Sequence, residues 1–382
     1  MPIRLLRASR YYDVAARAVS VRADFSVCWT CKQNARTLVL NLMKIHLLLA
    51  TVAIFAATVF AGSYPEAEIV NSELHVRLPL PDAANGFYRG IRFDPSGAIL
   101  SLTFRGHTFY GPWFDSVDPT VGDFVYRDDK IVAGPNSAMS GPVEEFQRPI
   151  GFDKAKPGGT FLKVGVGLLR RMDDQRYSFQ KKYDVVDRGT WNVDRSKDSI
   201  TFTQKLGTPG SAWAYVYTKT IRLTKDKPQM VISHSLRNVG TQPLVTNVYD
   251  HNFLVLDGEA PGPHYTIAVP YDIHPTREPP VDSVQINGKE ATYMKTLSGQ
   301  DRVAFGLQGF GETSSDYDFR ISDSKSGVAL RIQGDHPLSN ASVWSIRTVL
   351  AVEPFIDVKA DPGGEFTWTY TYTWSSYSAA AQ

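Results

Sequence analysis

The chain has 382 residues, of which 41 are basic and 39 acidic, and its formal net charge at neutral pH is +2. Residues 1–61 hold 8 of the basic and 2 of the acidic residues, so residues 62–382 carry 33 and 37 and a net charge of −4. A weakly acidic chain without a basic cluster argues against nucleic acid as a partner. Both cysteines, Cys28 and Cys31, precede residue 62, which excludes disulfides, thiolate nucleophiles and thiolate-bound metals from the rest of the chain.

The N-terminal segment has the pattern of a secretory signal peptide. Lys44 precedes an apolar run at residues 47–60, and Ala61 ends a stretch typical of a cleavage site. The run has about 14 residues, fewer than the ~20 that a membrane-spanning helix needs. We expect residues 43–61 to be a cleaved signal peptide, the alternative being an uncleaved anchor. Residues 1–42 would then be a leader extension or a misassigned start ahead of Met43.

Export follows from this interpretation. The mature protein would begin near residue 62 and act in the periplasm or outside the cell, with no stable membrane insertion after cleavage. No low-complexity linker interrupts residues 62–382, and no internal repeat is evident. We therefore expect residues 62–382 to form one domain.

The first segment with candidate functional residues is 85–114. It holds Arg89, Arg92 and His107 among several aromatic residues and turns. Guanidinium groups can bind the hydroxyls or carboxylates of sugars, and aromatic rings stack on sugar faces. Ordinary surface arginines are the alternative. Residues 141–146 add Glu144 and Glu145, of which strand alternation would direct only one inward, and Glu144 is the candidate.

Short alternating runs dominate the chain beyond residue 65. In residues 366–374, aromatic side chains alternate with threonines, which is typical of a strand with two different faces. Similar runs are residues 177–179, 213–217 and 328–332, and clusters of Gly, Pro, Asn and Asp separate them. Many strands and few helices predict an all-β fold, either a sandwich or a barrel.

Residues 245–257 contain a candidate proton-transfer histidine. If the segment is a strand, Tyr249, His251 and Phe253 share one face, and Asp250 and Asn252 share the other. A histidine held by polar neighbours can act as an acid or a base near neutral pH. A purely structural histidine is the alternative.

Residues 343–357 contain a candidate carboxylate. Read as one strand, the segment puts Trp344 on its apolar face and Arg347 and Glu353 on the other face. Glu353 is the only carboxylate between Asp335 and Asp357, so it is partly buried or points into a cleft. A solvated acid on an edge strand is the alternative.

Two motifs resemble those of the aldose 1-epimerases, also called galactose mutarotases. Residues 352–355 (VEPF), followed by 362–366 (PGGEF) and an aromatic last strand, resemble the family's C-terminal signature, although the glutamine after its catalytic glutamate is missing here. Residues 249–253 (YDHNF) resemble the stretch with the family's catalytic histidine. The resemblance implies a large antiparallel β-sandwich of the galactose-mutarotase type.

The resemblance also implies an activity. Glu353 would be the general base and His251 the general acid of sugar-ring opening, which interconverts anomers of a mono- or oligosaccharide without a metal or cofactor. Arg89, Arg92 and His107 correspond only by position to the family's binding residues. A non-catalytic carbohydrate-binding protein on the same fold is the main alternative. Glycoside hydrolysis would instead require a second carboxylate, Glu144 or Glu145, opposite Glu353. A structural calcium held by loop oxygens would escape a search for motifs.

Overall fold

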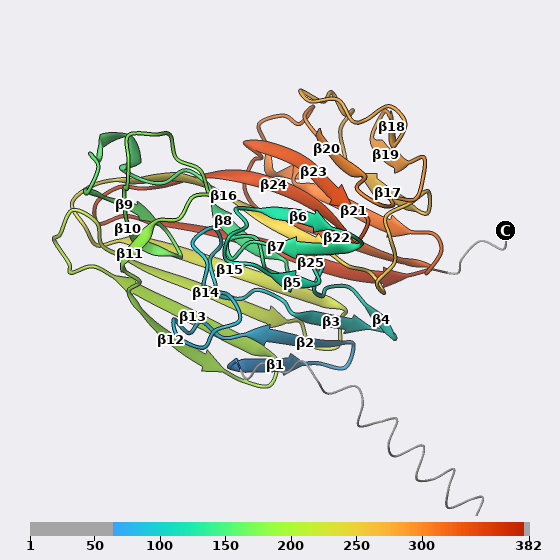
Figure 1. The fold of residues 1–382 in the computed structure, drawn as a ribbon. Helices are drawn as coiled ribbons and strands as arrows, with labels where there is room; N and C mark the ends of the chain where they lie inside the picture. Colours follow the sequence, from blue (N-terminus) through green and yellow to red (C-terminus); the bar gives the residue numbers. More distant parts are fainter. Residues whose placement is uncertain (1–63, 378–382) are drawn as a thin grey trace, which may run out of the picture. The chain divides into compact units, whose positions relative to one another are not determined.

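The computed structural model describes residues 64–377, which belong to one compact unit, Ser63–Gln382. The predicted leader extension, 1–42, and signal peptide, 43–61, lie outside the described residues. Within residues 64–377 the regular structure is β-strands and two short 3₁₀ turns, η1 (Phe152–Lys154) and η2 (Ser314–Asp316) (Figure 1). In this part of the chain no helix is long and apolar enough to cross a membrane.

A ten-stranded sheet forms the larger layer of the fold. In spatial order its strands are β12 (Thr190–Arg195), β13 (Ser199–Leu206), β14 (Tyr215–Leu223), β15 (Gln229–Asn238), β25 (Glu365–Ser376), β22 (Val328–Gly334), β21 (Asp318–Asp323), β17 (Tyr265–Ala268), β19 (Glu290–Tyr293) and β18 (Val284–Asn287).

A five-stranded sheet forms the second layer, and it carries the candidate site. Its order is β20 (Arg302–Gly306), β23 (Asn340–Ile346), β24 (Val349–Ala360), β16 (Leu244–Leu254) and β8 (Val143–Phe146). The two sheets face each other, since the Tyr372 hydroxyl of β25 donates to Asp250 of β16 at 2.5 Å.

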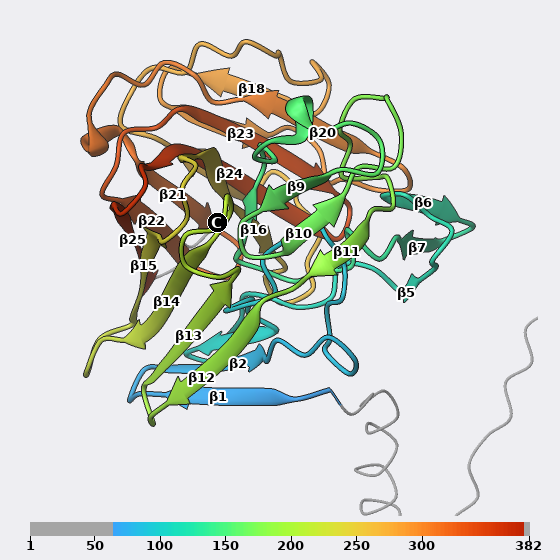
Figure 2. The same cartoon turned by 90° about the vertical axis from the view of Figure 1, so that its left-hand side faces the viewer.

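Three small sheets flank the sandwich. They are β1 (Glu66–Val70), β2 (Leu74–Pro79), β3 (Ser101–Phe104) and β4 (His107–Thr108); β11 (Asp184–Asp187), β10 (Gly167–Arg170) and β9 (Thr160–Lys163); and β5 (Ser116–Val117), β7 (Lys130–Ala133) and β6 (Phe124–Arg127). The sheet of β9, β10 and β11 lies at the end of the sandwich that is nearest the viewer in Figure 2. Among the described strands, only β5 and β7 pair in parallel.

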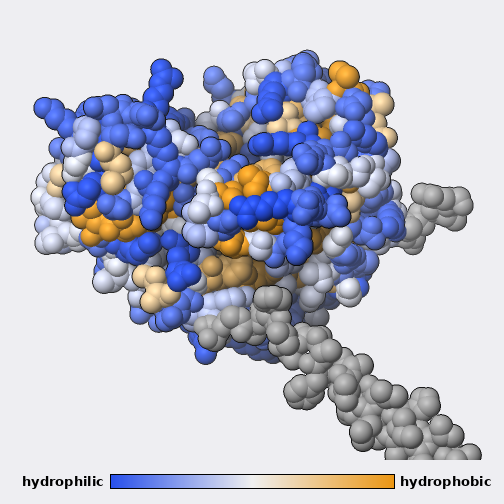
Figure 3. Space-filling view, viewed as in Figure 1, coloured by the Kyte–Doolittle hydropathy of each residue, from blue (hydrophilic) through white to orange (hydrophobic). Residues whose placement is uncertain are grey.

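The core lies between the two large sheets, and β25 shows why this sequence folds there. Trp368, Tyr370, Tyr372 and Trp374 are each at most 1% exposed, while the threonines between them face away from the core. Burying one such large side chain stabilises a fold by about 1.5–3 kcal/mol. The alternation in residues 366–374 therefore predicted this strand correctly, and the predicted all-β antiparallel sandwich is confirmed. Figure 3 shows one face of the molecule, which is mostly hydrophilic with smaller hydrophobic areas.

Two predicted strands are wrong. Residues 343–357 are not one strand but a hairpin, in which Ile346 of β23 pairs with Val349 of β24 across a two-residue turn. The turn puts Trp344 and Glu353 on the same face of the sheet, whereas the single-strand interpretation had separated them. Residues 177–179 lie in the connection between β10 and β11, where Tyr177 stacks on Tyr183 and Phe179 lies against the guanidinium of Arg92.

Candidate active site

A cavity lies on the face of the five-stranded sheet that points away from the ten-stranded sheet. Four neighbouring strands contribute to it, with Arg302 from β20, Trp344 from β23, Glu353 from β24 and His251 from β16. The cavity has a volume of about 160 Å³. A second lobe of about 290 Å³ shares Arg302, Trp344 and Glu353 with it, so the two form one cleft.

Strand register brings the predicted pair, Glu353 and His251, together. Tyr249 pairs with Phe355 and Asn252 with Val352 across β16 and β24, and the same register places His251 opposite Glu353. His251 Nε2 lies 3.1 Å from Glu353 Oε1. On the other side, the Ser342 hydroxyl of β23 donates to Glu353 Oε2 at 2.7 Å. The two groups are therefore in direct contact and not on opposite walls of the cleft.

Burial sets the protonation of this pair. The Glu353 side chain is 15% exposed and that of His251 is 4% exposed. Burial raises the pKa of the Glu353 carboxyl, against smaller opposing effects from the Ser342 hydrogen bond and Arg92. Burial, followed by the positive charge of Arg92, lowers the pKa of His251 well below its usual range. Both shifts favour the uncharged forms, so a single proton shared by the pair is favoured on Glu353.

Aromatic side chains build the walls of the cleft. His251 stacks on Phe253 with ring centroids 3.6 Å apart, and Phe253 stacks on Trp113 at 5.6 Å. Trp344 meets Trp113 edge to face at 5.6 Å. Phe124 and Phe179 also line the cavity. Flat apolar walls around a few polar groups are typical of small-molecule sites and suit the apolar face of a sugar ring.

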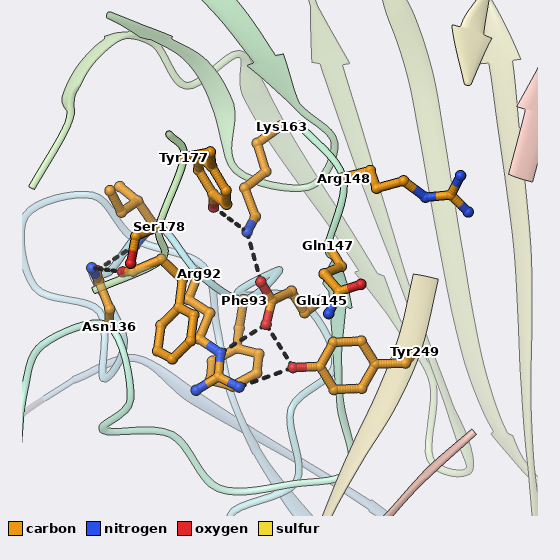
Figure 4. Close-up of polar contacts among 12 residues, drawn as sticks. Arg92, Phe93, Asn136, Glu145, Gln147, Arg148, Lys163, Tyr177, Ser178 and Tyr249 are labelled. Carbon is orange, nitrogen blue, oxygen red and sulfur yellow. Dashed lines mark hydrogen bonds and ion pairs between the residues drawn. The ribbon is translucent and has the colours of Figure 1, made fainter. Parts of the chain in front are cut away.

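A buried cluster of charges holds Arg92 at the cavity (Figure 4). Arg92 Nε donates to Glu145 at 2.7 Å, and its Nη2 donates to the Tyr249 hydroxyl at 2.9 Å. Lys163 Nζ donates to the other oxygen of Glu145 at 2.9 Å and to the Tyr177 hydroxyl at 2.8 Å. Burial raises the pKa of Glu145, but Lys163 and Arg92 outweigh it and lower the pKa to about 2. An ionised Glu145 thus fixes the orientation of Arg92.

Arg302 is the cationic residue of the cleft that sequence reasoning missed. It lines both lobes, and its guanidinium lies 5.5 Å from the centre of the Phe124 ring. Within residues 64–377 its side chain has no ion pair, whereas Arg92 is fully engaged by its neighbours. Its exposed side chain on β20 is therefore free to contact a ligand.

The structure does not bring the other predicted binding residues into the cleft. Arg89 donates to the Ala84 carbonyl on the molecular surface. His107 of β4 pairs with Asp257 at 2.7 Å. Arg347 occupies the turn between β23 and β24, where it donates to the carbonyls of Gly299 and Asp129.

Glu144 points to the opposite side of its strand from Glu145. Its carboxylate lies between the two large sheets, where it contacts Lys219 and, at 2.5 Å, His234. Glu145 is the residue of this pair that reaches the cleft, through Arg92. Alternation along β8 predicted that the two acids diverge, but both are buried, at 2% exposure each. Alternation alone could not show which of the two faces of β8 is the one that faces the cavity, so the sequence selected the wrong acid.

Among residues 64–377 there is no group of three or more His, Cys, Asp or Glu side chains placed to hold an ion.

Comparisons with known proteins found similarity only among solved structures. No family model matches the chain, and no curated protein matches it. The Slr1438 protein from Synechocystis is 12% identical with a TM-score of 0.49, and the match covers 82% of this chain and 97% of that one. The GalM/aldose epimerase homologue from C. elegans is 15% identical with a TM-score of 0.47, over 82% and 99% of the two chains.

A galactose mutarotase related enzyme from Lactobacillus acidophilus is 13% identical with a TM-score of 0.47, and the match covers 82% of this chain and 98% of that one. Two of these three descriptions name the family that the motifs at residues 249–253 and 352–366 resemble. At such identities and TM-scores the similarity assigns neither an activity nor a role to any residue.

Proposed function

We propose that the cleft binds a sugar and that Glu353 and His251 interconvert its anomers, as in an aldose 1-epimerase. The supporting observation is the contact of 3.1 Å between His251 Nε2 and Glu353 Oε1 at the floor of a cavity with aromatic walls. Export of the protein, predicted from residues 43–61, is part of the proposal, and the sugar would then be extracellular or periplasmic.

The proposed reaction needs one proton donor and one proton acceptor at neighbouring atoms. The acceptor takes the proton of the C1 hydroxyl as C1 becomes a carbonyl carbon, and the donor gives a proton to the ring oxygen as its bond to C1 breaks. Rotation about the bond between C1 and C2, followed by closure, returns both protons and yields the other anomer. The hydroxyl oxygen and the ring oxygen are both bonded to C1 in the closed ring, so an acid and a base that are in contact with each other can reach both oxygens at once.

Burial favours an assignment of roles that differs from the one the resemblance implies. In the uncharged form of the pair, Glu353 holds the proton and donates it to the ring oxygen, while the imidazole of His251 accepts the proton of the hydroxyl. The directions of the two pKa shifts support this form. Glu353 is the more exposed of the two groups and would make the closer contact with the sugar.

Polarimetry with a panel of freshly dissolved α-anomers tests the proposal. We expect the protein to accelerate the change in optical rotation of at least one aldose. If it binds a sugar of the panel in calorimetry but accelerates none, it is a carbohydrate-binding protein on this fold and the catalytic proposal is wrong.

Arg302→Ala is expected to raise KM for that aldose about tenfold or more and to change kcat much less. A hydrogen bond from a charged donor is typically worth about 1.5–3 kcal/mol, and Arg302 would make it to the sugar without taking part in proton transfer. Steady-state kinetics measures the effect. Arg320→Ala on β21, an exposed arginine of the other sheet, is the matched control and should leave both constants unchanged. An unchanged KM in Arg302→Ala would remove Arg302 from the site.

A further inference from the structure

A second cavity, of about 290 Å³, adjoins the wall of the cleft that holds Arg92. Three segments of the chain contribute neighbouring residues to both spaces. Arg92, Ser137 and Phe179 line the cleft, while Ile91, Asn136 and Gln180 line the second cavity.

Asn136 ties these segments together. Its side-chain oxygen accepts from the Ile91 amide at 3.0 Å, and its Nδ2 donates to the Phe179 carbonyl at 2.7 Å. These hydrogen bonds hold the wall between the cleft and the second cavity in place, so the shape of the second cavity is set by the backbone and not by a single surface side chain.

The second cavity is basic. Arg89, Lys182 and Arg188 line it, and none of its lining residues is acidic. Within residues 64–377, none of these three side chains forms an ion pair, and one of them, Arg188, is half-buried, whereas the buried cations Arg92 and Lys163 are both paired. Three like charges around one space favour an anion there.

Arg188 carries the strongest sign of a missing counter-charge. It is half-buried directly after β11, and burial lowers its pKa. The one titratable neighbour that opposes this shift is Tyr88, which is uncharged at neutral pH. A cation that is partly removed from water without an anionic partner destabilises a fold, and a bound anion would offset the loss.

The rest of the lining is largely apolar and could hold the body of a ligand. Its lining includes Ile91, Tyr183, Val185, Pro119 and Pro135. We propose that this cavity is a second binding site, which takes the carboxylate or sulfate group of an acidic saccharide. The saccharide part rests on the proposed function of the adjoining cleft, whereas the anion part rests on Arg89, Lys182 and Arg188 alone.

Calorimetry with a galacturonate tetrasaccharide and its neutral methyl ester, at one ionic strength, tests the proposal on the full chain. The acidic form should bind at least about tenfold more tightly than the ester, because charge-assisted hydrogen bonds to guanidinium form only with the carboxylate. The double variant Lys182→Gln/Arg188→Gln should lose this preference. The charge-matched control Arg195→Gln/Lys197→Gln, at exposed positions on the last residue of β12 and in the turn that follows it, should keep it.

Two further measurements place the anion. The Arg302→Ala variant should still bind the acidic form more tightly than the ester. If this variant lost the preference, the anion would bind in the cleft and the proposal would be overturned. Sodium sulfate should displace the tetrasaccharide only at much higher concentration than the tetrasaccharide itself needs for binding. Equal potency of inorganic sulfate would overturn the saccharide part.

The test separates this proposal from the one for the cleft. Equal binding of acid and ester, or an unchanged preference in Lys182→Gln/Arg188→Gln, would overturn the second site even if the protein interconverts the anomers of neutral sugars. Conversely, a preference that depends on Lys182 and Arg188 would support the second site even if polarimetry found no activity. The double variant should retain wild-type mutarotation of a neutral aldose, since neither residue lines the cleft.

Discussion

Glu353→Gln is expected to lower the kcat for anomer interconversion about 100-fold or more, with a much smaller change in KM. A positioned acid or base typically accelerates a reaction about 10²–10⁴-fold, and the amide can neither give nor take the proton. The amide does keep the shape of the side chain, and its oxygen can still accept the hydrogen bond from the Ser342 hydroxyl, which lies 2.7 Å from the Glu353 carboxylate in the wild type. Polarimetry at saturating sugar gives kcat, and chemical denaturation gives the stability.

The controls distinguish catalysis from a structural role. Glu290→Gln, at an exposed position on β19, removes a carboxylate elsewhere and should leave kcat unchanged. His251→Asn should lower kcat as Glu353→Gln does, and the double variant should lose less than the product of the two factors, because the groups act in one transfer. A Glu353→Gln protein with wild-type kcat would contradict the proposed role, whatever its stability.

The sequence predicted the fold because its strongest signals are local. Alternation in residues 366–374 is a property of neighbouring residues, and the same is true of the faces of residues 245–257. Asp250 and Asn252 do contact Tyr372 of the other sheet, while His251 and Phe253 line the cleft. The turn at Arg347 and Thr348 was missed because neither residue is one of the usual turn formers. That omission reversed the predicted relation between Trp344 and Glu353.

The rest of the site depends on contacts between distant segments. Arg302 of β20 and Phe124 of β6 belong to two different sheets and come together only where those sheets pack, and no pattern within either segment predicts this contact. Two partners of Arg92, Glu145 and Tyr249, are 53 and 157 residues away in sequence. Order in the sequence therefore suggested Glu353 and His251 as candidates through a resemblance, and the two side chains are in contact in the cleft, but it gave no sign of Arg302.

A buried ion cluster between the two large sheets gives the largest expected effect on stability. Lys219 of β14 is 1% exposed, and its Nζ contacts Glu144, Asp94 at 2.7 Å and the Ser96 carbonyl at 2.7 Å. Burial raises the pKa of Glu144, but Lys219 and His234 outweigh it and lower the pKa to about 2. Glu144 is thus ionised in the interior only because Lys219 and His234 lie beside it.

Lys219→Met is therefore expected to destabilise the protein by about 3–5 kcal/mol at neutral pH, since removing one partner of a buried ion pair leaves an uncompensated charge. The matched variant Lys205→Met changes an exposed lysine on the neighbouring strand β13, and it should shift stability by no more than about 0.5 kcal/mol. Urea unfolding of both variants and the wild type measures the difference. A loss below about 1 kcal/mol in Lys219→Met would show that the cluster adds little.

The same cluster predicts how the difference in stability between wild type and Lys219→Met varies with pH. In the wild type the pKa of Glu144 is about 2, below the value of about 4.3 for an unfolded glutamate, so ionisation of Glu144 stabilises the fold above pH ~4.3. That stability is lost as the pH falls from ~4.3 towards 2. Without Lys219 the carboxylate loses its main partner, and the stabilisation is missing at every pH. The difference in free energy of unfolding between wild type and Lys219→Met should consequently be largest at pH 7 and should decrease as the pH falls from ~4.3 to 2. A difference that stays constant over that range would show that Lys219→Met acts through packing and not through charge.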